Sequence, residues 1–279
     1  MRFEVTILGN GSASPAPGRH QTAHILNVRE QFFMVDCGEG MRARLVRAGV
    51  SPLKIGAIFI SHIHGDHVYG LMPLVASLGL SGKQTPLKIF GPAELRKLID
   101  FFQHDFGNPV LFDIEFTPVD TTRSQLVYEN RSMEVFSVPL RHRTPTTGYV
   151  FREKPDTQGH KSRSYAFLSD TLPSPKAARI VSELVPEGVD LMYHESTFAD
   201  ADRRLARETG HSTALQAAKI AGAARARKLL IGHFSSRYKD PSALEAEART
   251  AFAETYVAGE FETFSVPLAK AVSVSPEKD

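Results

Sequence analysis

The segment 62–67 reads His-Ile-His-Gly-Asp-His and gathers four side chains of metal-binding type within six residues. With Ser61 in front of it, the segment directly follows the apolar segment 57–60, which predicts a short buried strand. His62 and His64 lie two positions apart in an extended turn and point the same way, whereas Asp66 and His67 can swing to a second point nearby. The segment therefore predicts a metal site that can hold two ions.

Alternating and β-rich segments recur along the whole chain, with helical spacing between many of them. Strands are expected at 2–8, 24–28, 31–36, 57–60, 87–90, 113–116, 124–127, 132–138, 148–151, 165–169, 190–194, 228–231 and 261–266. Helices are expected at 38–48, 70–79, 92–104, 175–184, 212–224 and 241–253. This order favours two sheets packed face to face with helices outside. No linker divides the chain, so residues 1–272 are expected to form one domain and residues 273–279 a flexible tail.

Composition excludes two classes of protein. Apolar residues make up 42% of 279 residues and the net charge is +2, so the chain is not of the disordered class. The longest apolar run, 68–80, is interrupted by glycines, a proline and a serine and falls short of the ~20 residues that cross a bilayer. The start of the chain has no leader pattern and the single Cys37 can form no internal disulfide, so a cytoplasmic protein without a membrane partner is expected.

The segment 62–67 matches in full the His-x-His-x-Asp-His loop of the metallo-β-lactamase superfamily. Further blocks, in family order from residue 6 to 240, resemble ribonuclease Z, the tRNA 3′-end endonuclease. They are Leu-Gly-Asn-Gly-Ser at 8–12, Asp-Cys-Gly-Glu-Gly at 36–40, His142 with Gly-Tyr at 148–149, Ser-Asp-Thr at 169–171, His-Glu-Ser-Thr-Phe at 194–198, Gly-His-Ser-Thr-Ala at 210–214 and His-Phe at 233–234. The resemblance implies an α+β protein, an αββα sandwich of two packed mixed β-sheets with helices on the outer faces.

The resemblance also implies a set of metal ligands. The first ion would take His62, His64 and His142, and the second Asp66, His67 and His233, with Asp170 as a bridge. Imidazole and carboxylate groups suit two Zn²⁺ ions, with manganese or iron as alternatives. Two such ions can clamp a phosphodiester and supply hydroxide near neutral pH, so hydrolysis is the expected reaction. Asp36 is expected to build a loop beneath the metal site.

Catalytic roles follow from the same resemblance. Asp66 is either a ligand only or also the group that orients or deprotonates the attacking water. His211 is either a general acid for the leaving oxygen, held by Glu195, or a helix-capping neighbour without chemistry. The predicted contacts to substrate phosphate are Ser212, Thr213 and Arg237, the last of which could equally lie on the surface. Four further histidines match no motif and are expected at the surface or in turns: His20, His24, His104 and His160.

One family feature is missing. Ribonuclease Z proteins usually carry a protruding arm that grips the tRNA elbow, inserted between the third-motif histidine and the bridging aspartate. Here His142 and Asp170 are 28 positions apart, and the connection 152–164 has 13 residues, so a folded arm does not fit. The connection is expected to be a small basic loop. Other basic clusters, at 141–143, 203–207 and 225–228, are interpreted as solvated faces.

Three functions remain open. The first is a tRNA 3′-processing endonuclease, acting on precursor tRNA and expected to be a homodimer. The second is a small-molecule phosphodiesterase or other ester hydrolase of the same superfamily, which the missing arm favours. The third is a metal-bound binding protein without turnover. The native metal and the preferred trailer sequence do not follow from the residues.

Overall fold

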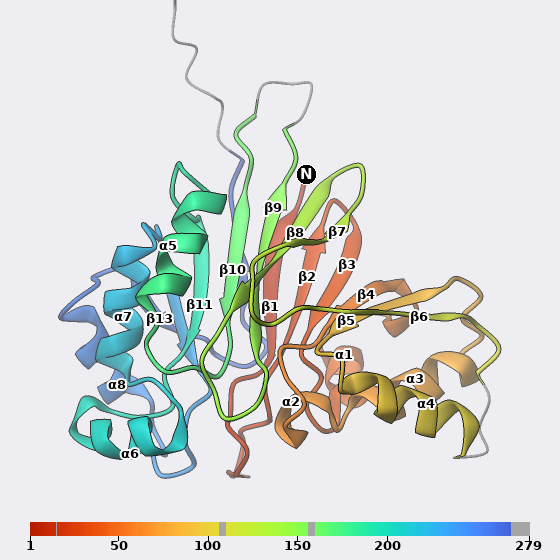
Figure 1. Cartoon of the computed structure of the whole chain (residues 1–279), viewed down its shortest axis with the longest axis horizontal. Coiled ribbons are helices and arrows are strands. Elements are labelled where there is room, and N and C mark those ends of the chain that lie inside the picture. The colour runs from red at the N-terminus through yellow and green to blue at the C-terminus, as the bar shows by residue number, and fades with distance from the viewer. Residues whose placement is uncertain (15, 106–109, 156–159, 269–279) are drawn as a thin grey trace, which may run out of the picture.

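Two seven-stranded sheets lie face to face at the centre of the molecule (Figure 1). The computed structural model describes every residue except 15, 106–109, 156–159 and 269–279, so the predicted tail 273–279 lies outside the described residues. The strands of the first sheet are β1 (Phe3–Gly9), β2 (Ala23–Val28), β3 (Gln31–Val35), β4 (Ile55–Phe59), β5 (Leu87–Gly91), β6 (Ile114–Pro118) and β14 (Thr263–Ser265). Their spatial order is β14-β1-β2-β3-β4-β5-β6.

The strands of the second sheet are β7 (Leu126–Glu129), β8 (Met133–Pro139), β9 (Thr147–Glu153), β10 (Ser164–Leu168), β11 (Leu191–Glu195), β12 (Leu229–Gly232) and β13 (Thr255–Val257). Their order is β13-β12-β11-β10-β9-β8-β7. In the first sheet β1, β2 and β3 pair antiparallel and β3 to β6 pair parallel. In the second sheet β7 to β10 pair antiparallel and β10 to β13 parallel. Both sheets are therefore mixed, as predicted.

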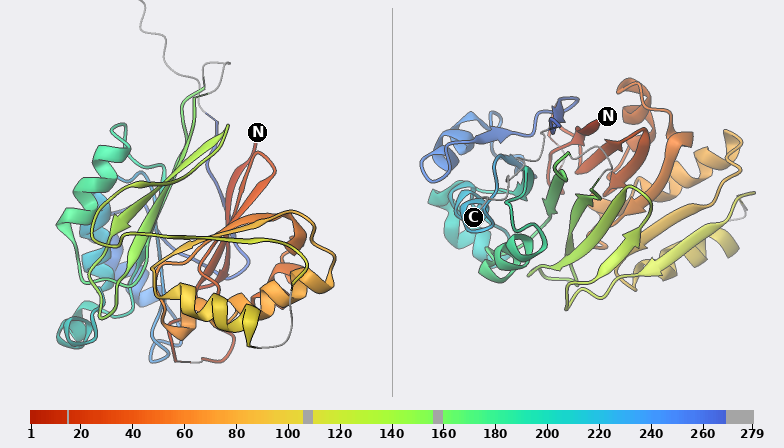
Figure 2. Two further views of the ribbon diagram at one scale, coloured as in Figure 1. Left: turned by 45° about the vertical axis from the view of Figure 1, so that its right-hand side comes forward. Right: turned by 90° about the horizontal axis from the view of Figure 1, so that it is seen from above.

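Helices cover the outer faces of the two sheets, as Figure 2 shows from two further directions. The helices on the side of the first sheet are α1 (Met41–Arg47), α2 (Gly65–Val68), α3 (Leu71–Leu80) and α4 (Leu95–His104). Those on the side of the second sheet are α5 (Pro175–Leu184), α6 (Arg203–Thr209), α7 (Ala214–Ala223) and α8 (Ser242–Arg249). Two short 3₁₀ turns, η1 (Pro52–Lys54) and η2 (Asp200–Asp202), complete the described elements.

The central strands of both sheets are buried on both faces, which explains their nearly continuous apolar sequences. In β10, Tyr165 and Phe167 pack between the sheets, whereas Ala166 and Leu168 pack against the outer helices. Strand β2 divides its residues in the same way between the inter-sheet core and the helix layer of the first sheet. The resulting four layers form the predicted αββα sandwich of the α+β class.

The sequence does not predict helices α2 and α6, strand β13 or the two 3₁₀ turns, and it gives the segment that forms α2 as an extended turn. Helix α6 buries only Ala206 among its seven residues, so no apolar stripe marks it as a helix. Strand β13 has three residues, fewer than a periodic pattern needs. By contrast, α5 has the predicted bounds, because Ser174 caps its first turn through the backbone N–H of Ala177 and Pro175 fits its first position.

Several strands end at one edge of the sandwich. The parallel strands β10, β11 and β12 end at the same edge, and β8 shares their direction because two antiparallel pairings separate it from β10. The loop after β4 of the first sheet meets this edge. Loops at such strand ends are where fold geometry concentrates functional groups. Among the described residues no helix is long and apolar enough to cross a membrane.

Candidate metal centre and active-site cavity

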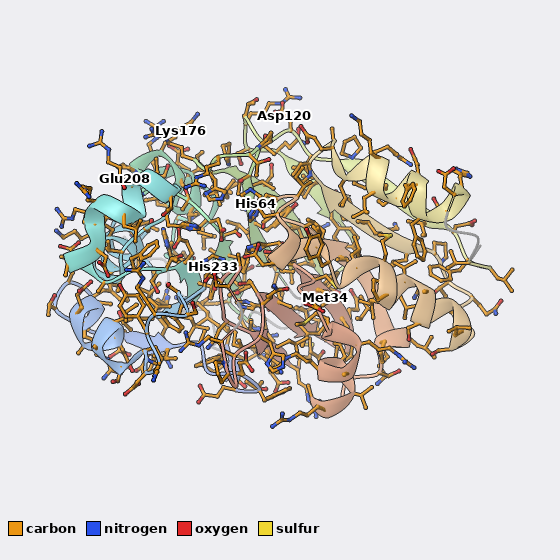
Figure 3. The ribbon with its side chains drawn as sticks, turned by 90° about the horizontal axis from the view of Figure 1, so that it is seen from below. Met34, His64, Asp120, Lys176, Glu208 and His233 are labelled. Carbon is orange, nitrogen blue, oxygen red and sulfur yellow. The ribbon has the colours of Figure 1, made fainter. Side chains whose placement is uncertain are left out.

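The seven predicted metal ligands converge from both sheets. The loop 61–67 follows β4, and its last residues form the first turn of α2, which turns Asp66 and His67 inward. The second sheet contributes His142 after β8, Asp170 after β10 and His233 after β12. His233 has φ +60°, a left-handed conformation that costs free energy outside glycine and that is typical of functional sites. Figure 3 shows His64 and His233 at the centre of the lower face.

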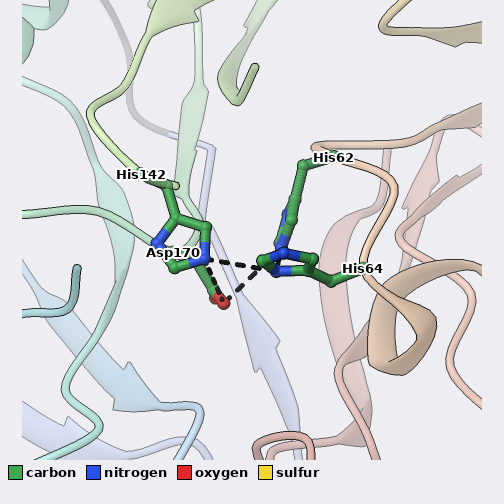
Figure 4. A group of neighbouring side chains, drawn as sticks. All are labelled: His62, His64, His142 and Asp170. Atoms are coloured by element: carbon green, nitrogen blue, oxygen red, sulfur yellow. Dashed lines mark hydrogen bonds and ion pairs between the residues drawn. The ribbon is translucent and has the colours of Figure 1, made fainter. Parts of the chain in front are cut away.

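The first group of donors consists of three histidines and one carboxylate oxygen (Figure 4). His64 Nδ1 lies 3.1 Å from His62 Nε2 and 3.2 Å from His142 Nε2. Asp170 Oδ2 lies 3.6 Å from His62 Nε2 and 3.8 Å from His142 Nε2. The four atoms therefore surround one point.

The second group lies beside the first and uses the other oxygen of the same carboxylate. Asp170 Oδ1 is 3.2 Å from His233 Nε2 and 3.4 Å from His67 Nε2. Asp66 Oδ2 is 3.3 Å from His233 Nε2 and 3.4 Å from His67 Nε2. Asp170 thus faces both groups, one oxygen to each, as a bridging ligand would.

Both groups fit a divalent metal ion. With metal–nitrogen bonds of about 2.0–2.1 Å, the donors of a tetrahedral ion stand about 3.3 Å apart, which is the middle of the separations found here. His67 Nε2 and Asp170 Oδ1 are buried and have no hydrogen-bond partner among the described residues. A buried polar atom without a partner is costly, so these two atoms require a ligand that accepts their lone pairs. A divalent metal cofactor meets that requirement.

The charges of the site also favour a cation. Burial lowers the pKa of His62, His64 and His142, which keeps these rings neutral as metal ligands must be. Burial raises the pKa of the Asp66 carboxyl, but the nearby imidazoles outweigh burial and hold that pKa below its usual range. The pKa of Asp170 is lowered for the same reason. Two buried carboxylates therefore stay ionised and need positive charge between them.

Groups behind the ligands fix the orientation of their rings. Asp36 accepts from His67 Nδ1 at 2.7 Å, and its carboxylate also accepts the backbone N–H and the hydroxyl of Ser61 at 2.7 and 2.9 Å. His142 Nδ1 donates to Gly210 O at 2.8 Å. Asp36 therefore lies beneath the metal site, as expected, and selects the tautomer of His67 that presents Nε2 to the site.

His211 and Glu195 form a pair at the margin of the two donor groups. His211 Nδ1 lies 3.1 Å from Glu195 Oε1, which also accepts the backbone N–H groups of Ser212 at 2.8 Å and Thr171 at 3.1 Å. Burial alone would lower the pKa of His211, but Glu195 raises it to about 9. The His211 side chain is 14% exposed, so it is held by a buried carboxylate and still reaches the cavity. This arrangement suits proton donation.

A cavity of about 540 Å³ opens over the donors and is lined by ligand residues, by His211 and by Arg237. The Arg237 guanidinium lies 3.6 Å from Asp202 and 5.2 Å from the centre of the Phe198 ring. Arg143, interpreted from the sequence as part of a solvated face, also lines this cavity. The signal that could have found it is its position next to His142.

The predicted phosphate contacts Ser212 and Thr213 are corrected by their surroundings. Both residues are fully buried, and neither lines the cavity. The Ser212 hydroxyl donates to the carbonyl of Thr171 at 2.7 Å. The Thr213 hydroxyl caps α7 through the N–H of Gln216 and donates to Asp200. Their hydroxyls therefore hold the loops after β10 and β11 and the start of α7, and neither lies in the cavity to meet a substrate.

The connection 152–164 is not the basic loop that the sequence predicts. Its described cations are ion-paired: Arg152 with Glu134, Lys154 with Glu129, Lys161 with Glu187 and Arg163 with Glu153. Arg163 is 3% exposed and also donates to the carbonyls of Met1 and Val266. Residues 156–159 of this connection lie outside the described residues. The described part offers little uncompensated positive charge.

Two mixed sheets with a His/Asp cluster at their shared edge define a metal-dependent hydrolase of the metallo-β-lactamase fold. Human tRNase Z, short form, superposes with a TM-score of 0.78 at 29% identity, covering 95% of this chain and 99% of that chain. A metallo-β-lactamase fold protein of Bacillus subtilis, YhfI, gives a TM-score of 0.73 over 95% of this chain and 100% of its own at 22% identity, which shows the fold alone.

The similarity to relatives found by sequence also extends over most of the chain. Ribonuclease Z of Porphyromonas gingivalis is 36% identical over 92% of this chain and 97% of its own length. Ribonuclease Z of Azobacteroides pseudotrichonymphae is 37% identical, covering 93% of this chain and 97% of its own. The chain therefore belongs to the ribonuclease Z family, and a family model described as Anti-Pycsar protein Apyc1 also matches residues 3–254.

One relative has segments that this chain lacks. The alignment with the Porphyromonas gingivalis protein extends over 300 positions, whereas this chain has 279 residues in total. The relative therefore has segments without a counterpart here. A missing arm would produce unmatched segments of this kind.

Proposed function

We propose that this chain is a metal-dependent endonuclease that removes 3′ extensions from precursor tRNA. The observation that carries the proposal is the convergence of seven ligand side chains and the His211–Glu195 pair on one cavity. Membership of the ribonuclease Z family supports tRNA as the substrate. Residues 1–272 act as a single hydrolase domain, because ligands from both sheets are needed for one site. The cytoplasmic location stays a prediction.

The bound cations are two Zn²⁺ ions. His62, His64 and His142 would hold the first, Asp66, His67 and His233 would hold the second, and Asp170 would face both. Near-tetrahedral donor separations and the nitrogen-rich donor set favour zinc over manganese or iron. Bound there, two such ions would supply Lewis-acid polarisation of a phosphodiester and a lowered pKa for bound water.

The remaining residues orient groups and move a proton. Asp66 lies on the cavity wall, where its carboxylate both ligates and orients the attacking water. His211, kept protonated by Glu195, donates a proton to the leaving 3′ oxygen, so the tRNA product ends in a 3′-hydroxyl. Glu195 itself is fully buried and acts through His211. Arg143 and Arg237 contact substrate phosphates at the cavity mouth.

The proposed catalysis is tested by changing the leaving group. His211→Ala should retain both metal ions, yet lose roughly 10²–10⁴-fold in rate on precursor tRNA. A nitrophenolate leaves without a proton, so the loss should shrink on bis(p-nitrophenyl) phosphate. His104→Ala, at an exposed site on α4, is the matched control. Equal losses on both substrates would reject the general acid, and fewer than two metal ions per folded chain in elemental analysis would reject the dinuclear site.

A second candidate function is hydrolysis of a compact phosphodiester. Two observations favour it: the described connection between β9 and β10 has no room for an arm, and the family model that matches residues 3–254 has a name other than ribonuclease Z. Side-by-side assays of 3′-extended tRNA and of small phosphodiesters decide between the two. Turnover of small phosphodiesters without any cleavage of tRNA would favour this second function.

The active protein is a homodimer. Val46 is 66% exposed and Tyr69 is 68% exposed. Val46 lines a surface cavity of about 510 Å³, and Gly70, the residue after Tyr69 in the sequence, lines the same cavity. Exposed apolar side chains gathered in this way are typical of interfaces. Light scattering should give twice the chain mass of 30.7 kDa, and Val46→Glu should shift the protein to the monomer. A monomeric wild-type protein would contradict the proposal.

A further inference from the structure

A second cavity, of about 400 Å³, adjoins the active-site cavity on the far side of His211. His211 lines both cavities. Three arginines line the second one, Arg141 from the loop before His142 and Arg203 and Arg207 from α6. No acidic side chain is part of its lining among the described residues. The proposed reaction does not use this cavity.

Two of the three arginines carry uncompensated charge. Arg203 pairs with Asp200 at 2.7 Å. Arg141 and Arg207 have no carboxylate within ion-pair distance in the part of the chain that the structure describes. The cations of the 152–164 connection differ in this respect, since each described one faces a glutamate. The second cavity therefore places uncompensated positive charge beside His211.

The two free arginines extend from backbone that is fixed to the metal centre. The Arg141 N–H donates to the Thr171 hydroxyl at 3.0 Å, and its carbonyl accepts from the N–H of Leu172. Helix α6, which carries Arg207, ends at Gly210, whose carbonyl accepts from His142 Nδ1. The cavity therefore keeps its position relative to the reacting groups.

We infer that this cavity binds the phosphate on the 5′ side of the leaving nucleoside, so that Arg141 and Arg207 hold the RNA strand one phosphate upstream of the cut. The inference rests on the proposed function. His211 protonates the leaving oxygen, so the leaving nucleoside lies beside His211, and its own 5′-phosphate is the next anion along the strand. Guanidinium groups bind phosphate through paired N–H donors.

The test compares adenylyl-adenosine with its 5′-phosphorylated form, using the metal-loaded protein. The added phosphate should lower KM about tenfold, the size of one charge-assisted hydrogen bond. Arg207→Gln and Arg141→Gln should each reduce this preference. Arg131→Gln is the matched control, because Arg131 is exposed and precedes β8 at the end opposite His142. Metal content is measured in every variant to exclude damage to the neighbouring ligand.

A binding measurement without turnover separates this inference from the proposed function. Adenosine 5′-monophosphate should bind at least about tenfold tighter than adenosine, and Arg207→Gln should remove that difference. If both dinucleotides are cleaved with equal KM, the inference is overturned and the nuclease function stands. If neither is cleaved while bis(p-nitrophenyl) phosphate is, the nuclease function fails. In that case binding of the monophosphate decides the inference: dependence on Arg207 supports it, and independence overturns it.

Discussion

His24 makes the stability of this protein sensitive to acid in a way that can be calculated. The residue lies in β2 between the sheets and is fully buried. Its Nδ1 lies 2.7 Å from the Tyr165 hydroxyl, its ring meets Tyr193 edge-on at 4.4 Å, and its Nε2 has no partner among the described residues. Burial lowers the pKa of His24 from 6.5 to about 3. The sequence-based expectation of a surface or turn position is therefore wrong for this histidine.

Proton linkage gives the direction and the size of the change in the free energy of unfolding. Between pH 6.5 and about 3 the unfolded chain binds a proton at this residue and the folded chain does not, so stability falls as pH falls through that window. At pH 5, with about 1.36 kcal/mol per pKa unit, the loss from His24 is about 2 kcal/mol. Urea unfolding at pH 7 and pH 5 measures the loss, which should be about 2 kcal/mol smaller in His24→Gln.

Acid also protonates the metal ligands and lowers the free energy of unfolding through them. That loss is the same in the wild type and in His24→Gln, so it cancels in the difference between the two. The glutamine amide can still accept the Tyr165 hydroxyl proton, which limits the cost at neutral pH. His104→Gln, at an exposed site, is the matched control. The reasoning is refuted if wild type and His24→Gln lose the same free energy between pH 7 and pH 5.

Three further perturbations have defined outcomes. Asp36→Asn should weaken divalent-metal binding about 10–100-fold in a chelator competition, because an amide cannot accept from both His67 and the loop above it. Arg163→Ala should lower the free energy of unfolding by about 3–5 kcal/mol, since it leaves Glu153 buried with one partner fewer, but the salt dependence of RNA binding should not change. Gly70→Ala should cost about 2–3 kcal/mol in urea unfolding, because its Cβ would lie 2.0 Å from the Gly38 carbonyl oxygen.

Local patterns determine how much of this fold can be predicted. Strand β10 is recognisable because its apolar residues are needed on both faces, and α5 because a capping serine and a proline mark its start. Helix α6 has no such signal, since its arginines face solvent and only Ala206 packs inward. Segments whose structure depends on distant packing are therefore the ones that sequence reasoning misses.

Local signals also identify part of the candidate site, whereas the rest of it depends on residues far apart in the sequence. The segment 62–67 is a continuous signal, so four of the seven ligands can be derived from spacing alone. His142, Asp170 and His233 lie far apart along the chain, and only the family resemblance connects them before the structure is known. Neither spacing nor the family resemblance predicts the burial of Arg163. That burial depends on an ion pair with Glu153 and on main-chain oxygens near both ends of the described chain.

The origin of the ligands in two different sheets gives any bound cation a mechanical role. The loop after β4 supplies four of the seven side chains, and loops of the second sheet supply the other three. An ion held by both fastens one layer of the sandwich to the other and binds only when the layers are docked. By mass action, ions at a hundredfold excess over Kd add about 2.7 kcal/mol per site to that docking. Chelation should therefore loosen the seam between the sheets, first at the edge where the ligands meet.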